Sequence, residues 1–383
     1  MIVGLAVVGL GFIAWHPEGL RNRHSDLVAY HLGMQTVVHD VWQADRRLAL
    51  WRPDILSGEP AFTNPQSLST HPFHLLFLFF EPDRVVGLVM WLQFLLVGLG
   101  AYWSTAVLRV SVASRLLIGS AALFSFKIIL AAYAGWLVPL AAIAALPLVF
   151  GALARAFARP SLAAALLLGG VGTVALHAGQ LQFVYYAALF GVVCSVVRVG
   201  QFLAARDRSN AVRLTAVLVL GALIAAGLSA HVLVPLAQDA TLITRTAADY
   251  TYFLGDPRLS RLGLLTVANP ALLGGPLEGG VIESWEYVAF FGAVTTVLAT
   301  VGAIGGRRRV GTRVILAVVV ASVLLATDTP VLRFAFDWIP GYALFRMPSR
   351  ILFLTAFFVC VLAGIGLDVI LRACPGALSL IHI

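Results

Sequence analysis

The chain has 383 residues, of which 60% are hydrophobic and only 11% are charged. No soluble core needs that ratio, and repeated apolar runs of about 18 or more residues are typical of helices that cross a bilayer. The net charge of +8 does not indicate nucleic-acid binding, because the arginines are distributed as the topology of a membrane protein requires.

Ten apolar segments predict ten membrane-spanning helices. They lie at about 1–15, 84–108, 115–133, 136–154, 161–178, 181–198, 213–236, 285–304, 313–327 and 349–371. Backbone groups inside lipid must be hydrogen-bonded within their own segment, so helices and not open sheets are expected. The expected fold class is an all-α polytopic membrane protein of about ten transmembrane helices, with a long outer loop after the first helix.

The distribution of charge predicts the orientation of the chain. With the N-terminus in the cytoplasm, the inner connections carry thirteen arginines and two acids, whereas the outer connections carry twelve arginines and sixteen acids. This asymmetry follows the positive-inside rule. Three long connections, 16–83, 237–284 and 328–348, are therefore predicted to face outward.

The loop after the first helix is polar and begins with an amphipathic stretch. A helix lying on the membrane surface is predicted from apolar residues at helical spacing, namely Leu27, Tyr30, Met34, Val37, Val38, Val41 and Leu48. Ser25 is a candidate N-cap, which places Asp26 in the first turn, where the helix dipole favours an ionised carboxylate. Turn-forming residues follow at 52–53, 57–60 and 64–65.

Polar residues also gather at three other outward connections. In chain order they are His177, Gln180 and Gln182 in a short turn, Glu283 and Glu286 before the eighth span, and Arg346 and Arg350 before the last span. The two arginines are four residues apart at a predicted helix start, which would put both on one face. Polar groups close to membrane depth are costly, so these positions are candidates for a site.

The cysteines and histidines do not form a metal-binding pattern. Cys194, Cys360 and Cys374 have no motif spacing and indicate neither a disulfide framework nor a zinc site. His71 and His74 have helical spacing, but Pro72 separates them and no thiol or third ligand is near in the sequence. We therefore expect no metal and no cofactor, with a divalent cation as the less favoured alternative.

Several landmarks follow one another in a recognisable order. The first loop reads Asp26, a helix, then Leu50-Trp51-x-Pro53-x-x-x-x-Gly58-x-Pro60-x-x-x-Asn64-Pro65-Gln66 and Pro72. The short turn reads His177-x-Gly179-Gln180, and the last stretch reads Phe345-Arg346-x-Pro348-x-Arg350-Ile351-Leu352. Over nearly the whole chain this pattern resembles the YfhO-like bacterial membrane proteins, relatives of the GT-C-fold glycosyltransferases.

The resemblance implies a sugar transferase of the bacterial cytoplasmic (inner) membrane with its active loops outside. The implied donor is a polyprenyl-phosphate-linked sugar, and the implied acceptor is a glycan, a lipid or a protein, with membrane lipids around the protein and no nucleic acid. Asp26 matches the essential acid of the first outer loop in such enzymes. Here it is flanked by Ser25 and Leu27 and not by a second acid, so a single base is the simplest implied mechanism.

The chemistry gives the other candidate residues their expected roles. A general base takes the proton of the acceptor hydroxyl, and cations stabilise the departing phosphate. We expect Asp26 to be the base and expect the remaining candidates to bind substrate: Arg346, Arg350, His177, Gln180, Gln182, Glu283, Glu286, Trp51, Asn64 and Gln66.

Each role has a simpler alternative. Asp26 can be a favourable charge at a helix start, the arginines can be interfacial anchors, and the loop acids can be solvated. For the whole protein the alternatives are a transporter or flippase for a lipid-linked sugar, or a non-catalytic subunit of an envelope-assembly complex. Charges within the membrane and broken helices in paired repeats would favour transport.

We expect residues 1–375 to form one GT-C-like transmembrane module. The last six residues, 378–383, match a translation of a transposon adapter used in sequencing libraries. Residues 376–383 are therefore expected to be a non-native tail.

Overall fold

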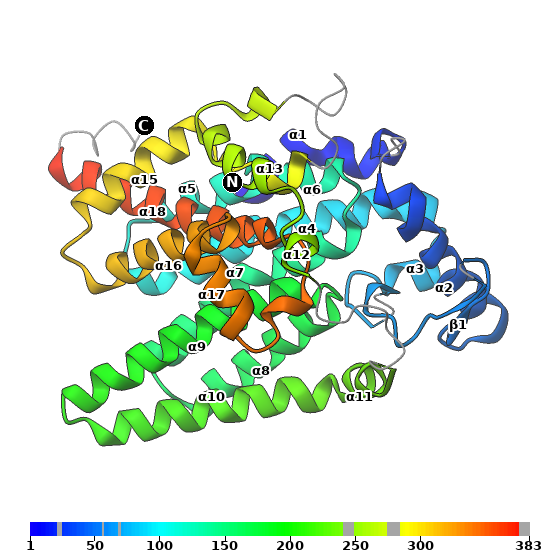
Figure 1. Cartoon of the computed structure of the whole chain (residues 1–383), viewed down its shortest axis with the longest axis horizontal. Helices are drawn as coiled ribbons and strands as arrows, with labels where there is room; N and C mark the ends of the chain where they lie inside the picture. Colours follow the sequence, from blue (N-terminus) through cyan, green and yellow to red (C-terminus); the bar gives the residue numbers. More distant parts are fainter. Residues whose placement is uncertain (21–24, 56, 68–69, 240–248, 274–283, 375–383) are drawn as a thin grey trace. The chain divides into compact units, whose positions relative to one another are not determined.

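The computed structural model describes residues 1–20, 25–55, 57–67, 70–239, 249–273 and 284–374. Across these ranges the protein is almost wholly helical (Figure 1), and the only strands are β1 (Trp51–Arg52) and β2 (Glu59–Pro60). The chain forms two compact units, Met1–Gly100 with Ala131–Thr244 and Ala101–Leu130 with Arg245–Ile383.

The first unit contains the N-terminal helix, the polar segment after it and a group of long apolar helices. Its helices are α1 (Ile2–Trp15), a π-helical turn (Leu27–His31), α2 (Leu32–Asp45), α3 (Leu76–Phe79), most of α4 (Pro82–Ser104), the end of α6 (Phe126–Tyr133), α7 (Leu137–Ala158), α8 (Leu162–His177), α9 (Leu181–Ala204), α10 (Arg208–Leu228) and α11 (Ala230–Asp239), with short 3-10 segments at Pro17–Leu20 and Pro65–Ser67.

The second unit contains the helices of the C-terminal part. They are α5 (Val112–Leu123), the start of α6, α12 (Tyr250–Leu254), α13 (Pro257–Leu262), α14 (Ser284–Tyr287), α15 (Ala293–Gly305), α16 (Val310–Ala326), α17 (Pro330–Trp338) and α18 (Leu352–Ala373). Short 3-10 segments lie at Thr105–Leu108, Gly263–Val267, Pro270–Leu273, Tyr342–Leu344 and Pro348–Ile351.

Six of the described helical segments are long and apolar enough to cross a membrane. They are Pro82–Leu108, Val112–Tyr133, Leu137–Ala158, Leu181–Ala204, Arg208–Leu228 and Pro348–Ala373. The count becomes seven if Val310–Ala326 and Pro330–Trp338, which meet at 83°, form one broken span. Three further apolar helices, α1, α8 and α15, are shorter. The protein is thus an all-α polytopic membrane protein, and the figure of ten spans stays a prediction.

Several predicted helix limits are wrong, because the backbone breaks inside the apolar runs. The predicted third span is confirmed as one apolar segment, Val112–Tyr133, with a local break at Phe124 between α5 and α6. The predicted seventh span is divided between α10 and α11 at Ser229. The predicted eighth span begins at Ala293 and not at 285, after Gly292 with a φ of 96°. Apolar composition sets where a segment is buried, but the hydrogen-bonding pattern decides where a helix begins and ends.

Glycines allow the closest helix contacts within each unit. In the first unit, Gly169 of α8 and Gly221 of α10 let these helices pack closely, because a Cβ at Gly221 would lie 3.1 Å from the side chain of Leu168. In the second unit, Gly302 of α15 and Gly366 of α18 each face the backbone of the other helix. Small residues commonly permit such close approach of membrane helices.

The polar segment of the first unit is held by a short hairpin and a small core. The strands pair antiparallel, with Trp51 opposite Pro60 and Arg52 opposite Glu59. The buried core beneath them consists of Met34, Val38, Ala49, Ala61 and Leu78. Because Met34 and Val38 belong to α2, the predicted amphipathic helix packs its apolar face against protein at these positions.

Candidate functional site

Asp26 begins the helical part of the polar segment. Its backbone N–H donates to the carbonyl oxygen of Ala134 over 3.0 Å, and its side chain is exposed. The hydroxyl of Ser25, only 1% exposed, accepts from the N–H of Leu27 over 3.2 Å. Ser25 thus contacts an N–H of the first turn as predicted, but that turn is π-helical and the α-helix starts only at Leu32.

Gly135 fixes the backbone beside Asp26. Its φ of 73° lies in the left-handed region, where a side chain is strained. A Cβ at this position would collide with the hydroxyl of Ser25 and would lie 2.6 Å from the nitrogen of Leu27. No sequence pattern singles out Gly135, because the need for glycine there depends on contacts with residues more than 100 positions away along the chain.

A polar network connects the helical part of this segment with its hairpin. The hydroxyl of Tyr30 donates to Glu59 Oε1 over 3.0 Å and accepts from Asn64 Nδ2 over 2.7 Å. Arg52, 3% exposed, donates from Nε to Asp54 Oδ1 over 2.9 Å, and its guanidinium lies 5.2 Å from the centre of the Tyr30 ring. Burial and the neighbouring Glu59 carboxylate raise the pKa of Tyr30 to about 12.

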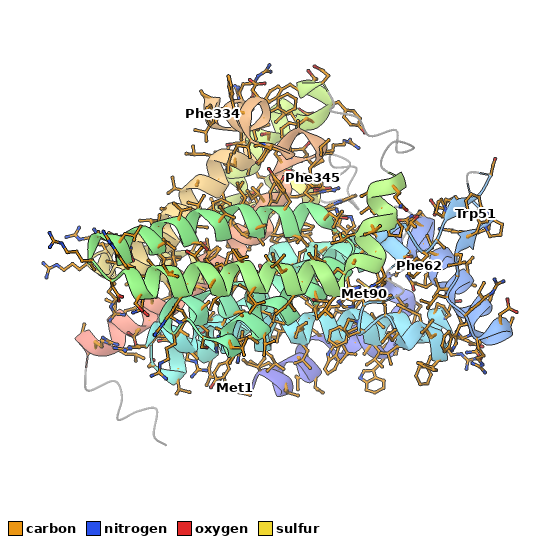
Figure 2. All side chains as sticks on the ribbon, turned by 90° about the horizontal axis from the view of Figure 1, so that it is seen from below. Met1, Trp51, Phe62, Met90, Phe334 and Phe345 are labelled. Carbon is orange, nitrogen blue, oxygen red and sulfur yellow. The ribbon has the colours of Figure 1, made fainter. Side chains whose placement is uncertain are left out.

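This network assigns structural contacts to residues of the predicted motif. Asn64 also accepts from the backbone N–H of Gln66 over 2.9 Å, so its amide closes the turn and joins it to Tyr30. Trp51 is 53% exposed and lies at the outer edge of the segment (Figure 2). Its indole covers Gly58, where a Cβ would come within 2.6 Å of the ring nitrogen. The sequence pattern did not predict that Arg52 and Glu59 lie opposite each other in the hairpin, because a strand of two residues is too short to show an alternation of apolar and polar side chains.

Three histidines are buried next to this network. His31, His71 and His74 are 4%, 2% and 1% exposed. Burial is the main cause that lowers the pKa of His31 and of His71 to about 4, and it lowers the pKa of His74 well below its usual value. Gln93 donates from Nε2 to His74 Nε2 over 3.1 Å. Within the described ranges no three His, Cys, Asp or Glu side chains are grouped so that they could hold a metal ion.

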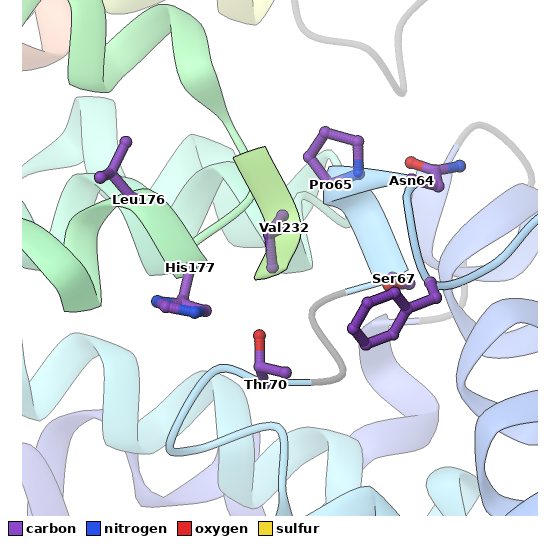
Figure 3. Close-up of a pocket in the computed structure, with 8 residues that line it drawn as sticks. Asn64, Pro65, Ser67, Thr70, Leu176, His177 and Val232 are labelled. Atoms are coloured by element: carbon purple, nitrogen blue, oxygen red, sulfur yellow. The ribbon is translucent and has the colours of Figure 1, made fainter. Parts of the chain in front are cut away.

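A pocket in the first unit brings together two of the predicted site residues, Asn64 and His177. It is lined by Phe62, Asn64, Pro65, Ser67, Thr70, Leu176, His177 and Val232 (Figure 3). The polar segment supplies one side, the end of α8 supplies His177, and α11 supplies Val232. The enclosed space is about 10 Å³, room for about one water molecule. Asn64 and His177 thus share one pocket, although they come from separate parts of the chain.

His177 has a defined orientation at the end of α8. Its Nδ1 lies 2.8 Å from the carbonyl oxygen of Thr173, and its Nε2 lies 3.4 Å from Nε2 of His231. His231 is exposed at the start of α11, and its ring lies 6.2 Å from that of Phe62. Sequence reasoning gave no role to His231, since it lies in an apolar stretch 54 residues after its partner.

The other two residues of the predicted turn have different surroundings. Gln180 is the residue before α9, with a half-buried side chain. Gln182 is 3% exposed and donates from Nε2 to the hydroxyl of Tyr186 over 3.0 Å. Neither of these side chains lines the pocket with His177.

In the second unit, Glu286 is bound by Arg350 and lies beside Lys127. Arg350 donates to the carboxylate from Nη2 over 2.6 Å and from Nε over 3.1 Å. Lys127, 0% exposed, donates to the backbone oxygens of Trp285 and Glu286 over 2.7 and 2.8 Å. Its Nζ also lies 4.9 Å from the centre of the Phe353 ring. Glu286 is therefore an ion-pair partner in the folded protein, and Lys127 holds the backbone around it.

The predicted common helix face for Arg346 and Arg350 is wrong. Met347 has a φ of 58°, and the 3-10 segment begins only at Pro348, so Arg346 precedes the helical part. Arg346 is exposed, with its guanidinium 5.3 Å from the centre of the Tyr252 ring, whereas Arg350 turns to Glu286. Glu283 lies outside the described residues.

No family model matches the chain, no curated protein matches it, and no solved structure matches it. The resemblance to YfhO-like proteins therefore stays a prediction from the sequence, and the functional argument depends on the geometry of the two units.

Proposed function

We propose that the protein is an integral-membrane glycosyltransferase that moves a sugar from a polyprenyl-phosphate donor to a cell-envelope acceptor, with Asp26 as general base. The observation that carries the proposal is the placement of Asp26. The Asp26 side chain is exposed, while its backbone N–H is hydrogen-bonded to Ala134. The residues on either side of it, Ser25 and Leu27, pack against Gly135. A catalytic base needs this combination, since it must reach the substrate from a rigid position.

The proposed step is a displacement at the anomeric carbon. The carboxylate of Asp26 takes the proton of the acceptor hydroxyl as its oxygen forms the new bond to the sugar. The bond from the sugar to the lipid phosphate breaks, and its electron pair leaves with the phosphate. Asp26 at the beginning of a helix suits this role at neutral pH, because the helix dipole favours the ionised carboxylate that accepts the proton.

The two arginines are no longer equal candidates for a phosphate contact. Arg350 already uses its planar fork on Glu286, which balances its charge. Arg346 is exposed, and its contact with a lipid phosphate stays a prediction from the sequence.

The test is sugar transfer in membranes that contain the full-length protein. Radiolabelled polyprenyl-phosphate sugars are supplied to the parent, to Asp26→Asn and to Asp40→Asn. Asp40 is a matched control, since it is an exposed acid on the neighbouring α2. We expect transfer by the parent and by Asp40→Asn and none by Asp26→Asn at equal membrane insertion. Equal transfer by all three would remove Asp26 from the mechanism.

A transporter or flippase for a lipid-linked sugar is the second candidate, and Lys127 favours it. This lysine lies in the candidate span Val112–Tyr133, is 0% exposed, and follows the helix break at Phe124 by three residues. Buried charges and discontinuous helices are common where membrane proteins bind and move a substrate. The contacts of Lys127 with backbone oxygens also suit a purely structural role.

Reconstituted vesicles separate the two functions. A fluorescent polyprenyl-phosphate sugar is placed in both leaflets, and its movement across the bilayer is followed with and without an acceptor. A flippase moves the intact lipid in the Asp26→Asn variant as fast as in the parent. A transferase releases the sugar from its phosphate in the parent and not in Asp26→Asn, and neither protein moves the intact lipid faster than it moves in vesicles without protein.

A further inference from the structure

Helix α17 of the second unit has an exposed apolar face, formed by Val331, Phe334 and Trp338. These side chains are 43%, 60% and 74% exposed. They are three and four residues apart, so they lie on one side of the helix. Leu332 and Ala335, on a second side, are 0% and 1% exposed. The exposed apolar face is therefore separate from the side that α17 buries within the protein.

The third side of α17 is polar. Arg333 binds Asp337 over 3.0 Å, with side chains 54% and 39% exposed. At 3.6 residues per turn, this pair lies on a different side from both the exposed apolar face and the buried residues. Such a division suits a helix that contacts protein, water and lipid at the same time.

Side-chain contacts hold the bend between α16 and α17. The two helices meet at 83°. The hydroxyl of Thr329 donates to the carbonyl oxygen of Leu324 over 2.8 Å and accepts from the N–H of Leu332 over 3.2 Å, so one side chain is bonded to both helices. Asp328, next to it, accepts from the hydroxyl of Tyr250 over 3.0 Å. These contacts keep α17 nearly perpendicular to α16.

The length of α16 places the bend near a membrane surface. The exposed arginines 307–309 and Arg313 lie at the start of the helix, and such cations are typical of the membrane boundary. The 17 residues of α16 extend over about 25 Å, and the hydrocarbon layer of a bilayer is about 30 Å thick. A crossing that starts at these arginines therefore ends near the opposite surface, and a helix perpendicular to it there runs along that surface.

We propose that α17 lies in the membrane interface, with its exposed apolar face inserted between the lipid headgroups and the acyl chains. The partner of this face is the bilayer surface itself. Arg333 and Asp337 then face the headgroups and water, and α16 crosses the membrane without α17 as a second half of the span.

Continuity with α16 favours lipid over a protein partner for this face. Val320 and Leu324 of α16 are 50% and 37% exposed, and exposed apolar side chains continue across the bend at Val331 of α17. Trp338 ends the face, and tryptophan is enriched at the depth of the headgroups. The inference does not depend on the proposed transfer reaction.

The test measures the depth of single sites in the full-length protein, reconstituted in phosphatidylcholine vesicles. The native cysteines are replaced by alanine, and an environment-sensitive fluorophore is attached at Phe334→Cys, Arg333→Cys or Val320→Cys. The cysteine-free protein treated with the same label gives the background. Three quenchers are compared: iodide in water, a nitroxide at the lipid headgroup and a nitroxide near the end of an acyl chain. Arg333→Cys is the matched control on the polar side of α17, and Val320→Cys marks the middle of the membrane.

We expect the label at Phe334→Cys to be quenched most by the headgroup nitroxide, and several-fold less by iodide than the label at Arg333→Cys. The label at Val320→Cys should be quenched most by the deep nitroxide. Strongest deep quenching at Phe334→Cys would make α17 the second half of a broken span. Strong iodide quenching there would place the face in water, and protection from all three quenchers would show that a second copy or another protein covers it. Each of these three results would overturn the proposal.

Discussion

Arg350 holds the carboxylate of Glu286 with Nη2 2.6 Å from Oε1 and with Nε 3.1 Å from each carboxylate oxygen. The Glu286 side chain is 3% exposed and the Arg350 side chain 23% exposed. The pair connects the short helix α14 to the segment that leads into α18, and Lys127 donates to the backbone oxygen of Glu286 in α14. Its shortest contact, 2.6 Å, is closer than the 2.8 Å of the Arg261–Asp328 and Arg372–Asp368 pairs.

Glu286→Gln should strongly destabilise the second unit. The change leaves Arg350 partly buried without its counter-charge, beside the buried ammonium of Lys127, and such a loss typically costs about 3–5 kcal/mol. The measurement is unfolding by a denaturing detergent in mixed micelles, followed by circular dichroism. Arg350→Lys should be milder, since it keeps the charge but loses the forked contact.

The matched control for this pair is Asp337→Asn. Asp337 binds Arg333 over 3.0 Å in an exposed pair on α17, with side chains 39% and 54% exposed. Exposed pairs of this kind contribute about 0.3–0.5 kcal/mol. An equal loss of stability in Glu286→Gln and Asp337→Asn would contradict the special role of the buried pair.

Gly135→Ala should disturb the position of Asp26. The new Cβ meets the Ser25 hydroxyl and the Leu27 backbone, in a left-handed conformation that already disfavours alanine. We expect a loss of stability of about 1–3 kcal/mol and a fall in sugar transfer. Gly170→Ala is the control, because no atom lies within 4 Å of a Cβ there. Unchanged transfer in Gly135→Ala would show that the backbone at Asp26 does not need this glycine.

Gly302→Ala and Gly366→Ala should each push α15 and α18 apart. A Cβ at Gly302 meets the carbonyl oxygen of Leu362, and one at Gly366 meets that of Leu298. Backbone cannot move aside as a flexible side chain can, so about 2 kcal/mol or more of stability should be lost in each case. Gly311→Ala on α16, where a Cβ meets nothing within 4 Å, should change stability little or raise it. Equal melting temperatures for all three would contradict the close packing of α15 on α18.

Lower pH should destabilise the first unit through its buried histidines. Burial, and secondly the Arg52 charge, lower the pKa of His31 from 6.5 to about 4. Between pH 4 and pH 6.5 the unfolded chain binds a proton that the folded chain does not bind. The free energy of unfolding is therefore highest above about pH 6.5 and falls toward pH 4. For His31 the fall amounts to about 3 kcal/mol.

The test is the pH dependence of unfolding for the parent and His31→Gln. The variant should show a smaller loss of stability between pH 6.5 and 4, and His74 should account for part of the remaining slope. Parallel curves for the two proteins would contradict a neutral, buried His31.

The polar segment shows how far sequence reasoning reaches for the site. Ser25, Asp26 and the helix after them were predicted from capping preference and apolar spacing, which act between residues a few positions apart. The position of Arg346 was mispredicted, because a left-handed Met347 interrupts the helix that the four-residue spacing assumed. The candidate roles of Asp26 and Arg346 in sugar transfer stay predictions.

The sequence by itself determined that the protein is built of apolar helices that belong in a membrane, since that follows from composition and the length of apolar runs. Only the tertiary structure decided which polar groups meet: Arg350 with Glu286 across 64 residues, and His177 with His231 across 54. The physical reason is that a local pattern reports which face of a helix is apolar, whereas the partner of a buried charge depends on how distant helices pack.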